Sequence, residues 1–274
     1  IKSASVGFFN EVIMYEKRRD FTFRRTALIL DIECYINYFL VAVRDVADPT
    51  KTKQWEMRGN GDMLNIEEMR RFFRNSTIIT FNGNNYDIPI LTLALDGANC
   101  STLKSASDDI IVGRVSPWDF YKTRGVNPPA YLDHVDIFNL PKGGLSLKVY
   151  AARIGAAKLQ DLPIEPDARL TRTDMDEISK YCDNDTTNTL QLYKHFEKAV
   201  GVRVALSNVY GIDLRSKSDA QVAEGLLIRL IERKKGYRIS KPDLIPYMRG
   251  FKFKPPKELH FITKQMRDVF DVVK

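Results

Sequence analysis

An apolar run that ends in two closely spaced carboxylates places the strongest constraint on how this chain can fold. Residues 28–30 are Leu-Ile-Leu, and Asp31 and Glu33 follow with one residue between them. Because side chains alternate between the faces of a β-strand, Asp31 and Glu33 point to the same side. Two like charges held this close raise each other's pKa unless a cation lies between them. The pair therefore indicates either a divalent-metal site built from oxygen ligands or a strand end whose acids are solvated.

Length and charge allow a single large domain with an appendage and point to a polyanionic partner. The chain has 274 residues, a net charge of +7 and 44% hydrophobic residues. Its two ends, residues 1–25 and 201–274, are basic, and residues 26–200 are acidic in balance. Basic ends favour nucleic acid as a partner. No apolar run reaches the roughly 20 residues of a membrane span, so we expect no membrane partner.

The order of expected elements predicts an α/β protein with a mixed sheet. Alternating or β-branched runs predict strands, and capped apolar-periodic stretches predict helices. The expected strands cover residues 26–31, 38–43, 55–58, 76–81 and 134–139. The expected helices cover residues 66–73, 90–95, 146–154, 173–197, 218–235 and 264–272. Residues 96–130 are rich in Gly, Ser, Asp and Pro, which predicts a loop-rich surface insertion.

A tight Asn- and Gly-rich loop is expected to place a third acid at the same sheet edge. The loop follows the strand that ends near Phe81, and Gly83 is the residue expected to take a positive φ. Asp87 comes next, with Pro89 in the first turn of a helix. Such a position is common for a simple helix cap, but it also lies at the carboxyl edge of a strand, where open α/β sheets bind ligands. Asp136 is a further acid that could face the metals, but we favour a structural or capping role for it.

The longest expected helix carries a tyrosine and an acid on one face. Tyr181 and Asp185 are four residues apart and therefore neighbours on the helix surface. Asp183 points elsewhere, and we expect it to be solvated. Thr173 and Asp176 predict an approximate capping box at the start of the helix.

Together these acids could hold two divalent cations, Mg²⁺ or Mn²⁺, about 3.5–4 Å apart around a phosphodiester. The candidate metal ligands are Asp31, Glu33, Asp87 and Asp185. Tyr181 could orient the attacking water, although a phenol with a pKa near 10 makes a poor base. Asn82 and Asn85 are candidates for hydrogen bonds to the terminal sugar or base. Phe81 and Tyr86 are candidates for stacking on the substrate, or equally for buried anchors of the loop.

Three spaced motifs resemble those of the DEDD 3′→5′ exonucleases in the same order. They are Asp31-x-Glu33, Asn82-x-x-x-Tyr86-Asp87 and Tyr181-x-x-x-Asp185, and the tyrosine is typical of the tyrosine subclass. Residues 79–91, 144–147, 151–155 and 214–221 are similar to segments of the proofreading domains of phage-type DNA polymerases. The resemblance implies an RNase H-like fold, with a mixed five-stranded sheet between helices, and two divalent metals.

The resemblance also implies a function and a domain organisation. We expect an N-terminal extension (1–25), an exonuclease domain (26–200) and a basic, mainly helical C-terminal extension (201–274). The expected activity is proofreading: hydrolysis of 3′-terminal nucleotides from a single-stranded or frayed DNA end. The sequence contains no polymerase palm motif, so a polymerase partner would be another domain or chain. An RNA 3′-exonuclease and a non-catalytic nucleic-acid-binding or polymerase-docking module remain alternatives.

The cysteines and the chain start bear on location and processing. Cys34, Cys100 and Cys182 form no CxxC pair, which fits a reducing compartment. We expect a cytoplasmic protein, in the host-cell cytoplasm if a phage encodes it. The sequence starts at Ile1 without an initiator methionine, from which we expect a processed or cloned fragment.

Overall fold

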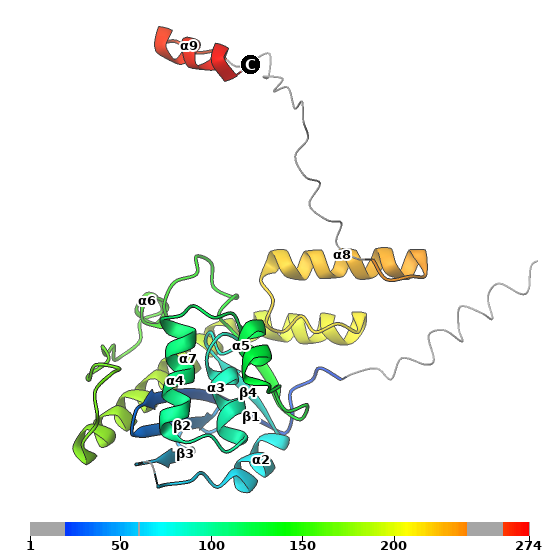
Figure 1. Ribbon diagram of the computed structural model, residues 1–274. Helices are drawn as coiled ribbons and strands as arrows, with labels where there is room; N and C mark the ends of the chain where they lie inside the picture. The colour runs from blue at the N-terminus through cyan, green and yellow to red at the C-terminus, as the bar shows by residue number, and fades with distance from the viewer. Residues whose placement is uncertain (1–19, 60, 240–259, 274) are drawn as a thin grey trace, which may run out of the picture. The chain divides into compact units, whose positions relative to one another are not determined.

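A computed structural model describes residues 20–59, 61–239 and 260–273. The described residues up to 229 form an α/β structure around a mixed five-stranded sheet (Figure 1). The strand order is β3-β2-β1-β4-β5. The strands are β1 (Thr26–Tyr35), β2 (Tyr38–Asp45), β3 (Thr52–Met57), β4 (Ser76–Thr80) and β5 (Asp133–Asp136). The pairings β1–β2 and β2–β3 are antiparallel, and the pairings β1–β4 and β4–β5 are parallel. The predicted α/β class and all five predicted strands are confirmed.

Strand β1 lies at the centre of the sheet and is longer than expected. It extends to Tyr35 through the antiparallel register with β2, in which Glu33 lies opposite Leu40. Asp31 and Glu33 therefore lie inside a strand and not beyond its end. On the other side, β1 pairs with β4 only as far as Ile29, opposite Ile79. The carboxylates thus sit where β1 extends past its parallel neighbour.

One face of the sheet is covered by the helix that follows β3 and by the three helices between β4 and β5. Leu28, Leu30 and Ile32 of β1 point into this core, which also includes Met69 and Leu103. The covering helices are α2 (Ile66–Arg74), α3 (Asp87–Leu95), α4 (Cys100–Ile111) and α5 (Pro117–Arg124). Because α4 and α5 are ordered helices that bury apolar side chains in this core, the expectation of a loop-rich surface insertion over residues 96–130 was wrong.

The other face of the sheet is covered by α6 (Leu147–Arg153) and by α7 (Arg172–Tyr210), a helix of 39 residues. Two apolar clusters lie there: one joins Ile29 to Leu190, and the other joins Tyr35 to Ile178. Asp31 and Glu33 belong to the same face of β1 as Ile29 and Tyr35. The polar pair therefore interrupts an otherwise apolar contact between β1 and α7.

The start of α7 is fixed by a capping box and by the β1–β2 hairpin. Thr171 accepts a hydrogen bond from the backbone of Asp174, whose side chain accepts one from the backbone of Thr171. The expected pair, Thr173 and Asp176, was therefore wrong by two residues. Just before the helix, the Asn37 side chain forms two hydrogen bonds of 2.9 Å with the backbone of Leu170: its Nδ2 donates to the carbonyl oxygen, and its Oδ1 accepts from the N–H. This clamp sets the position of α7 along β1, and hence of every side chain that α7 presents to the sheet.

The chain divides into two compact units, Ile1–Arg229 and Leu230–Lys274. Helix α7 continues through residue 200, where we had placed a domain boundary, and ends at Gly211 with a left-handed φ of 71°. The predicted helices near residues 218–235 and 264–272 are confirmed as α8 (Asp219–Lys235) and α9 (Lys264–Val273). Most of the N-terminal extension, and the segment 240–259, lie outside the described residues. Within the described part of the chain, no helix combines the length and apolar character needed to cross a membrane.

Candidate active site

Three elements bring the four predicted acids into one site. Asp31 and Glu33 come from β1, Asp87 is the first residue of α3, and Asp185 lies on α7. The charges of Asp31, Asp185 and Asp87 each raise the pKa of Glu33. Because repulsion between charges falls with distance, these acids lie near Glu33. The structure therefore brings together acids that are up to 154 residues apart in the chain.

Burial raises the pKa of every one of these carboxyls, and repulsion from neighbouring acids raises the pKa of Asp31, Glu33 and Asp87 further. For Asp31 the main cause is burial and the second is the charge of Asp185, and its pKa rises to about 7. Burial is also the first cause for Glu33, Asp87 and Asp185. Asp31 and Glu33 are only partly buried, but neighbouring acids disfavour the ionised form of each. Four acids in this state are costly for the fold unless cations neutralise them.

The donor set fits divalent cations. Asp31 and Glu33 each offer a carboxylate oxygen, and these oxygens lie within 4.8 Å of each other and of the Cys182 sulfur. Oδ1 of Asp185 is buried and has no hydrogen-bond partner among the described residues. A buried carboxylate oxygen without a hydrogen-bond partner calls for an explanation, and a role as a metal ligand provides one. Carboxylate oxygens suit Mg²⁺ or Mn²⁺.

Cys182 was not predicted to belong to the site. Its thiol lies 3.4 Å from Oδ2 of Asp31 and favours the ionised form of that acid. Burial, followed by the charge of Asp31, raises the pKa of the thiol itself, so it remains protonated. Cys182 therefore acts as a neutral hydrogen-bond donor behind Asp31. The residue lies next to Tyr181 in the sequence, but nothing in the pattern distinguishes it from a core cysteine.

Tyr181 is buried beside Asp185, as the four-residue spacing predicted. Its hydroxyl favours ionisation of Asp185, and burial together with the nearby acids raises the pKa of the phenol. The phenol thus stays protonated, so that it can donate a hydrogen bond but cannot act as a base.

Lys148 is the cation that balances the site, and sequence reasoning missed it. Its ammonium nitrogen lies 5.8 Å from the centre of the Tyr181 ring, and its charge lowers the pKa values of Asp185 and Glu33. It also forms an ion pair of 3.1 Å with the exposed Asp161. Helix α6 carries this lysine to the site, and no spacing in the sequence connects it with the acids.

Asp183 lies on α7 between these residues but is not part of the site. It forms an ion pair of 2.5 Å with Arg44 of β2, so the expectation that it is simply solvated was wrong. The same guanidinium donates to the backbone oxygen of Pro49 at 2.6 Å. Asp183 therefore fastens α7 to the sheet, and Asp185 faces the other acids.

The loop between β4 and α3 is held by Asp136. This buried acid accepts hydrogen bonds from the backbone nitrogens of Asn82 and Asn84 at 2.9 and 3.0 Å, which confirms the structural role expected for it. The positive φ lies at Asn82, at 67°, and not at Gly83 as expected. Gly83 is needed for space, because a Cβ there would lie 2.0 Å from the Thr80 hydroxyl.

The four predicted substrate-binding residues lie around this loop. Asn85 donates to the side-chain oxygen of Asn82 at 2.7 Å, and Asn85 is exposed. The Phe81 ring packs edge-on against Phe138 at 5.3 Å, and the Tyr86 hydroxyl lies 3.0 Å from that of Ser107. Both aromatic rings are thus partly buried anchors of the loop, and their stacking on a substrate remains a prediction.

No protein-family model matches the chain, and no curated protein matches it either.

Proposed function

We propose that this protein is a metal-dependent 3′→5′ exonuclease of the DEDD type, with an RNase H-like fold, that hydrolyses 3′-terminal nucleotides of DNA. One observation carries the proposal: four carboxyls from β1, α3 and α7 share one crowded site, and each has a raised pKa. Such a cluster is stable in its ionised form only with bound cations. The order of the motifs in the chain, and the tyrosine beside the last acid, resemble that class of enzyme.

In this proposal Asp31, Glu33, Asp87 and Asp185 hold two divalent cations, Mg²⁺ or Mn²⁺. When bound, such cations lower the pKa of water and stabilise charge on the oxygen that leaves. The reaction joins a water oxygen to the terminal phosphorus and breaks the bond from phosphorus to the 3′ oxygen, which releases a nucleoside 5′-monophosphate. No covalent enzyme intermediate is required.

The remaining residues position and balance these groups. The Tyr181 hydroxyl directs its one proton to Asp185, and its oxygen can accept a hydrogen bond that orients the water. Lys148 offsets the negative charge of Asp185 and Glu33, and the Cys182 thiol supports the ionised form of Asp31. Asn82 and Asn85 lie on the loop that leads to Asp87, where they can contact the terminal sugar or base. Proofreading for a phage-type DNA polymerase is the biological role that we infer.

The test is degradation of a 5′-labelled DNA with a mismatched 3′ end, with Mg²⁺ or with EDTA. We expect stepwise shortening that needs the metal and is lost in the double variant Asp31→Asn, Glu33→Gln. A paired 3′ end should be shortened more slowly than the frayed one. An RNA of the same sequence tests the alternative of an RNA exonuclease. DNA binding without any shortening, in Mg²⁺ and in Mn²⁺, would instead indicate a non-catalytic binding module.

A further inference from the structure

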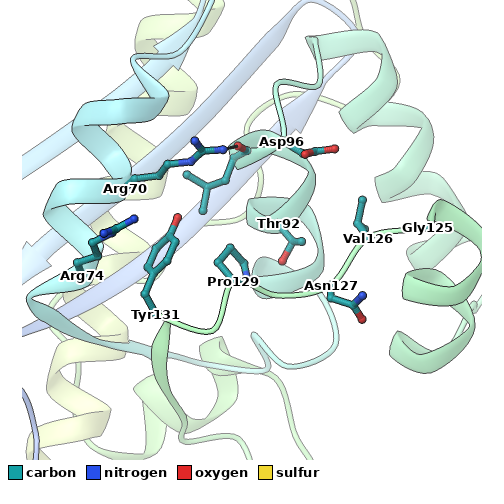
Figure 2. Close-up of a pocket in the computed structure, with 10 residues that line it drawn as sticks. Arg70, Arg74, Thr92, Asp96, Gly125, Val126, Asn127, Pro129 and Tyr131 are labelled. Carbon is teal, nitrogen blue, oxygen red and sulfur yellow. Dashed lines mark hydrogen bonds between the residues drawn. The ribbon is translucent and has the colours of Figure 1, made fainter.

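A cavity of about 370 Å³ lies near the C-terminal end of α3, whereas Asp87 of the proposed active site begins this helix (Figure 2). It is formed by α2, by the C-terminal end of α3 and by the segment that connects α5 to β5. Asp87 begins α3, and Thr92 and Leu95, which line the cavity, lie about 8 and about 12 Å further along the helix. None of the four carboxylates lines this cavity.

Two arginines from successive turns of α2 line one end of the cavity. Arg70 is held by Glu67 at 2.9 Å and by the backbone oxygen of Leu95 at 3.1 Å. Arg74 stacks over the Tyr131 ring, with its guanidinium carbon 5.1 Å from the ring centre. Among the described residues, Arg74 has no acidic partner. Two cations four residues apart on a helix repel each other, and a bound anion would relieve that repulsion.

Tyr131 adds an unused hydrogen-bond donor at the same end of the cavity. Its hydroxyl oxygen is buried, and within the part of the chain that is described the hydroxyl proton has no acceptor. The cations nearest to it, Arg70 and Arg74, contain donors only, so neither can accept the phenolic proton. A buried hydroxyl is costly without an acceptor, and an oxyanion next to the two guanidiniums would provide one.

The other end of the cavity has a different character. Figure 2 shows Arg70, Arg74 and Tyr131 at one side of the view, with Val126 and Asn127 at the other. Asp96 contributes a carboxylate to the lining, and Leu95, Val126 and Pro129 contribute apolar surface. The cavity thus offers cations and a phenol for an anionic head, then an apolar wall, then groups that accept hydrogen bonds. Its volume lies near the lower limit for small-molecule pockets.

We propose that this cavity binds a small phosphate-bearing molecule of the nucleoside monophosphate class. The phosphate would be bound by Arg74, by the Tyr131 hydroxyl and by Arg70, because a guanidinium matches two phosphate oxygens at once. The amino groups of the base would face Asp96 and Asn127. A longer nucleic acid strand fits less well, since Asp96 would repel the phosphates that follow the first. This binding goes beyond the proposed exonuclease activity and needs neither hydrolysis nor metal.

The test is calorimetric titration of the full chain with deoxyadenosine monophosphate in EDTA, which removes metal-dependent binding at the four carboxylates. We expect Arg74→Ala to raise the dissociation constant about tenfold or more, because it removes a charged hydrogen bond. Tyr131→Phe keeps the ring and should raise it severalfold. Arg71→Ala is the matched control, because Arg71 is an exposed arginine of the same helix that does not line the cavity. It should bind like the unaltered protein.

Two further probes decide the class of ligand. Deoxyadenosine, which lacks the phosphate, should not bind measurably, and a single-stranded oligonucleotide should bind equally well to the Arg74→Ala variant and to the unaltered protein. No binding of the monophosphate at millimolar concentration, or equal binding by all variants, would overturn the proposal. An oligonucleotide affinity that falls in the Arg74→Ala variant would overturn it in favour of a strand-binding surface. None of these outcomes depends on whether the protein hydrolyses DNA.

Discussion

The Cys182 thiol on α7 lies 3.4 Å from Oδ2 of Asp31 on β1, and this contact joins the two elements at the centre of the site. The thiol lowers the pKa of Asp31, which burial and the charge of Asp185 otherwise raise. A carboxyl must lose its proton before it binds a cation. The position of a neutral donor behind Asp31 therefore favours metal binding.

Replacing Cys182 should weaken metal binding only if the donor is lost. Cys182→Ala removes the hydrogen bond, so the pKa of Asp31 rises further, and the dissociation constant for Mn²⁺ at pH 7 should increase a few-fold. Cys182→Ser keeps a donor and should bind nearly as well as the unaltered protein. Titration calorimetry with Mn²⁺ measures both constants. Equal weakening in the two variants would show that the volume of the sulfur matters and not its proton.

Without metal, the carboxyl cluster should make the fold less stable as the pH rises. The pKa of Asp31 is about 7 in the folded protein, against an ordinary value of 3.8. The folded state therefore binds more protons than the unfolded state between these values. The stabilisation by the protonated form is present below about pH 4 and is lost as the pH rises through 7, by up to about 1.4 kcal/mol per pH unit.

The variant Asp31→Asn has no such titration at this position. In EDTA its melting temperature should therefore exceed that of the unaltered protein by a margin that grows from pH 5 to pH 8. Addition of Mg²⁺ should raise the melting temperature of the unaltered protein and have little effect on the variant. A margin that shrinks with pH would show that Asp31 is not held in its protonated form. The thermal unfolding must be followed at several pH values with and without the metal.

Asp183 and Asp185 should differ sharply when each is changed to asparagine. Asp185→Asn removes a ligand from the carboxyl cluster and should abolish exonuclease activity. Asp183→Asn breaks only the ion pair with Arg44, in which the Asp183 side chain is 48% exposed, so activity should persist. The stability loss should be about 1 kcal/mol or less, as for other solvent-screened ion pairs. The two variants, changed two residues apart on α7, are compared by activity assays and by urea unfolding. Loss of activity in Asp183→Asn would contradict the assignment of Asp183 to a structural role.

Lys148 should set the lower pH limit of activity. Its charge lowers the pKa values of Asp185 and Glu33, so Lys148→Met should raise both. The acidic limb of the pH–rate profile should then move to higher pH, because the carboxyls of the cluster lose their protons only at higher pH. Lys148→Arg keeps the charge and should leave the limb nearly in place. If the rate of Lys148→Met falls equally at all pH values, the lysine contacts the substrate and does not act through the acids.

The sequence determined the parts of the fold that depend on short-range periodicity. The alternation around Asp31 and Glu33 is a property of any strand, and Pro89 marks the first turn of α3, so the placement of three acids followed from local rules. The two helices within residues 96–130 were missed although their caps were present. Asn99 and Ser116 each accept a hydrogen bond from the backbone three residues on. Their mixed composition hid the helical periodicity, and tertiary packing, of α4 against β1 and of α5 against α3, stabilises them as helices.

The features that could not be predicted depend on contacts between distant segments. Lys148 and Cys182 reach the carboxyl cluster only because the Asn37 clamp and the packing of α6 and α7 place them there. The Arg44–Asp183 pair joins residues 139 positions apart, and an exposed acid in a helix carries no signal for such a partner. The end of α7 was placed too early because packing continues to support the helix beyond Glu197, through Val200 and Ser207.

Gly83 should be the residue of the β4–α3 loop that tolerates a methyl group least. A Cβ at this position would lie 2.0 Å from the Thr80 hydroxyl, which itself lies 2.8 Å from Nε2 of the half-buried His134. Gly83→Ala must therefore displace either the loop or the Thr80–His134 pair. We expect a loss of about 1–3 kcal/mol in the free energy of unfolding, as for other overpacked sites.

The backbone oxygen of Gly83 also accepts a hydrogen bond of 2.9 Å from Ile88, the residue after Asp87. A displaced loop should move Asp87, so Gly83→Ala should also weaken Mn²⁺ binding. Gly61→Ala is the matched control, because a Cβ there meets no atom within 4 Å and the backbone has no positive φ. Its midpoint in urea should stay unchanged while that of Gly83→Ala falls at constant slope. If Gly83→Ala is as stable as Gly61→Ala, the loop is loose enough to absorb the methyl group, and it cannot hold Asp87 rigidly against β1.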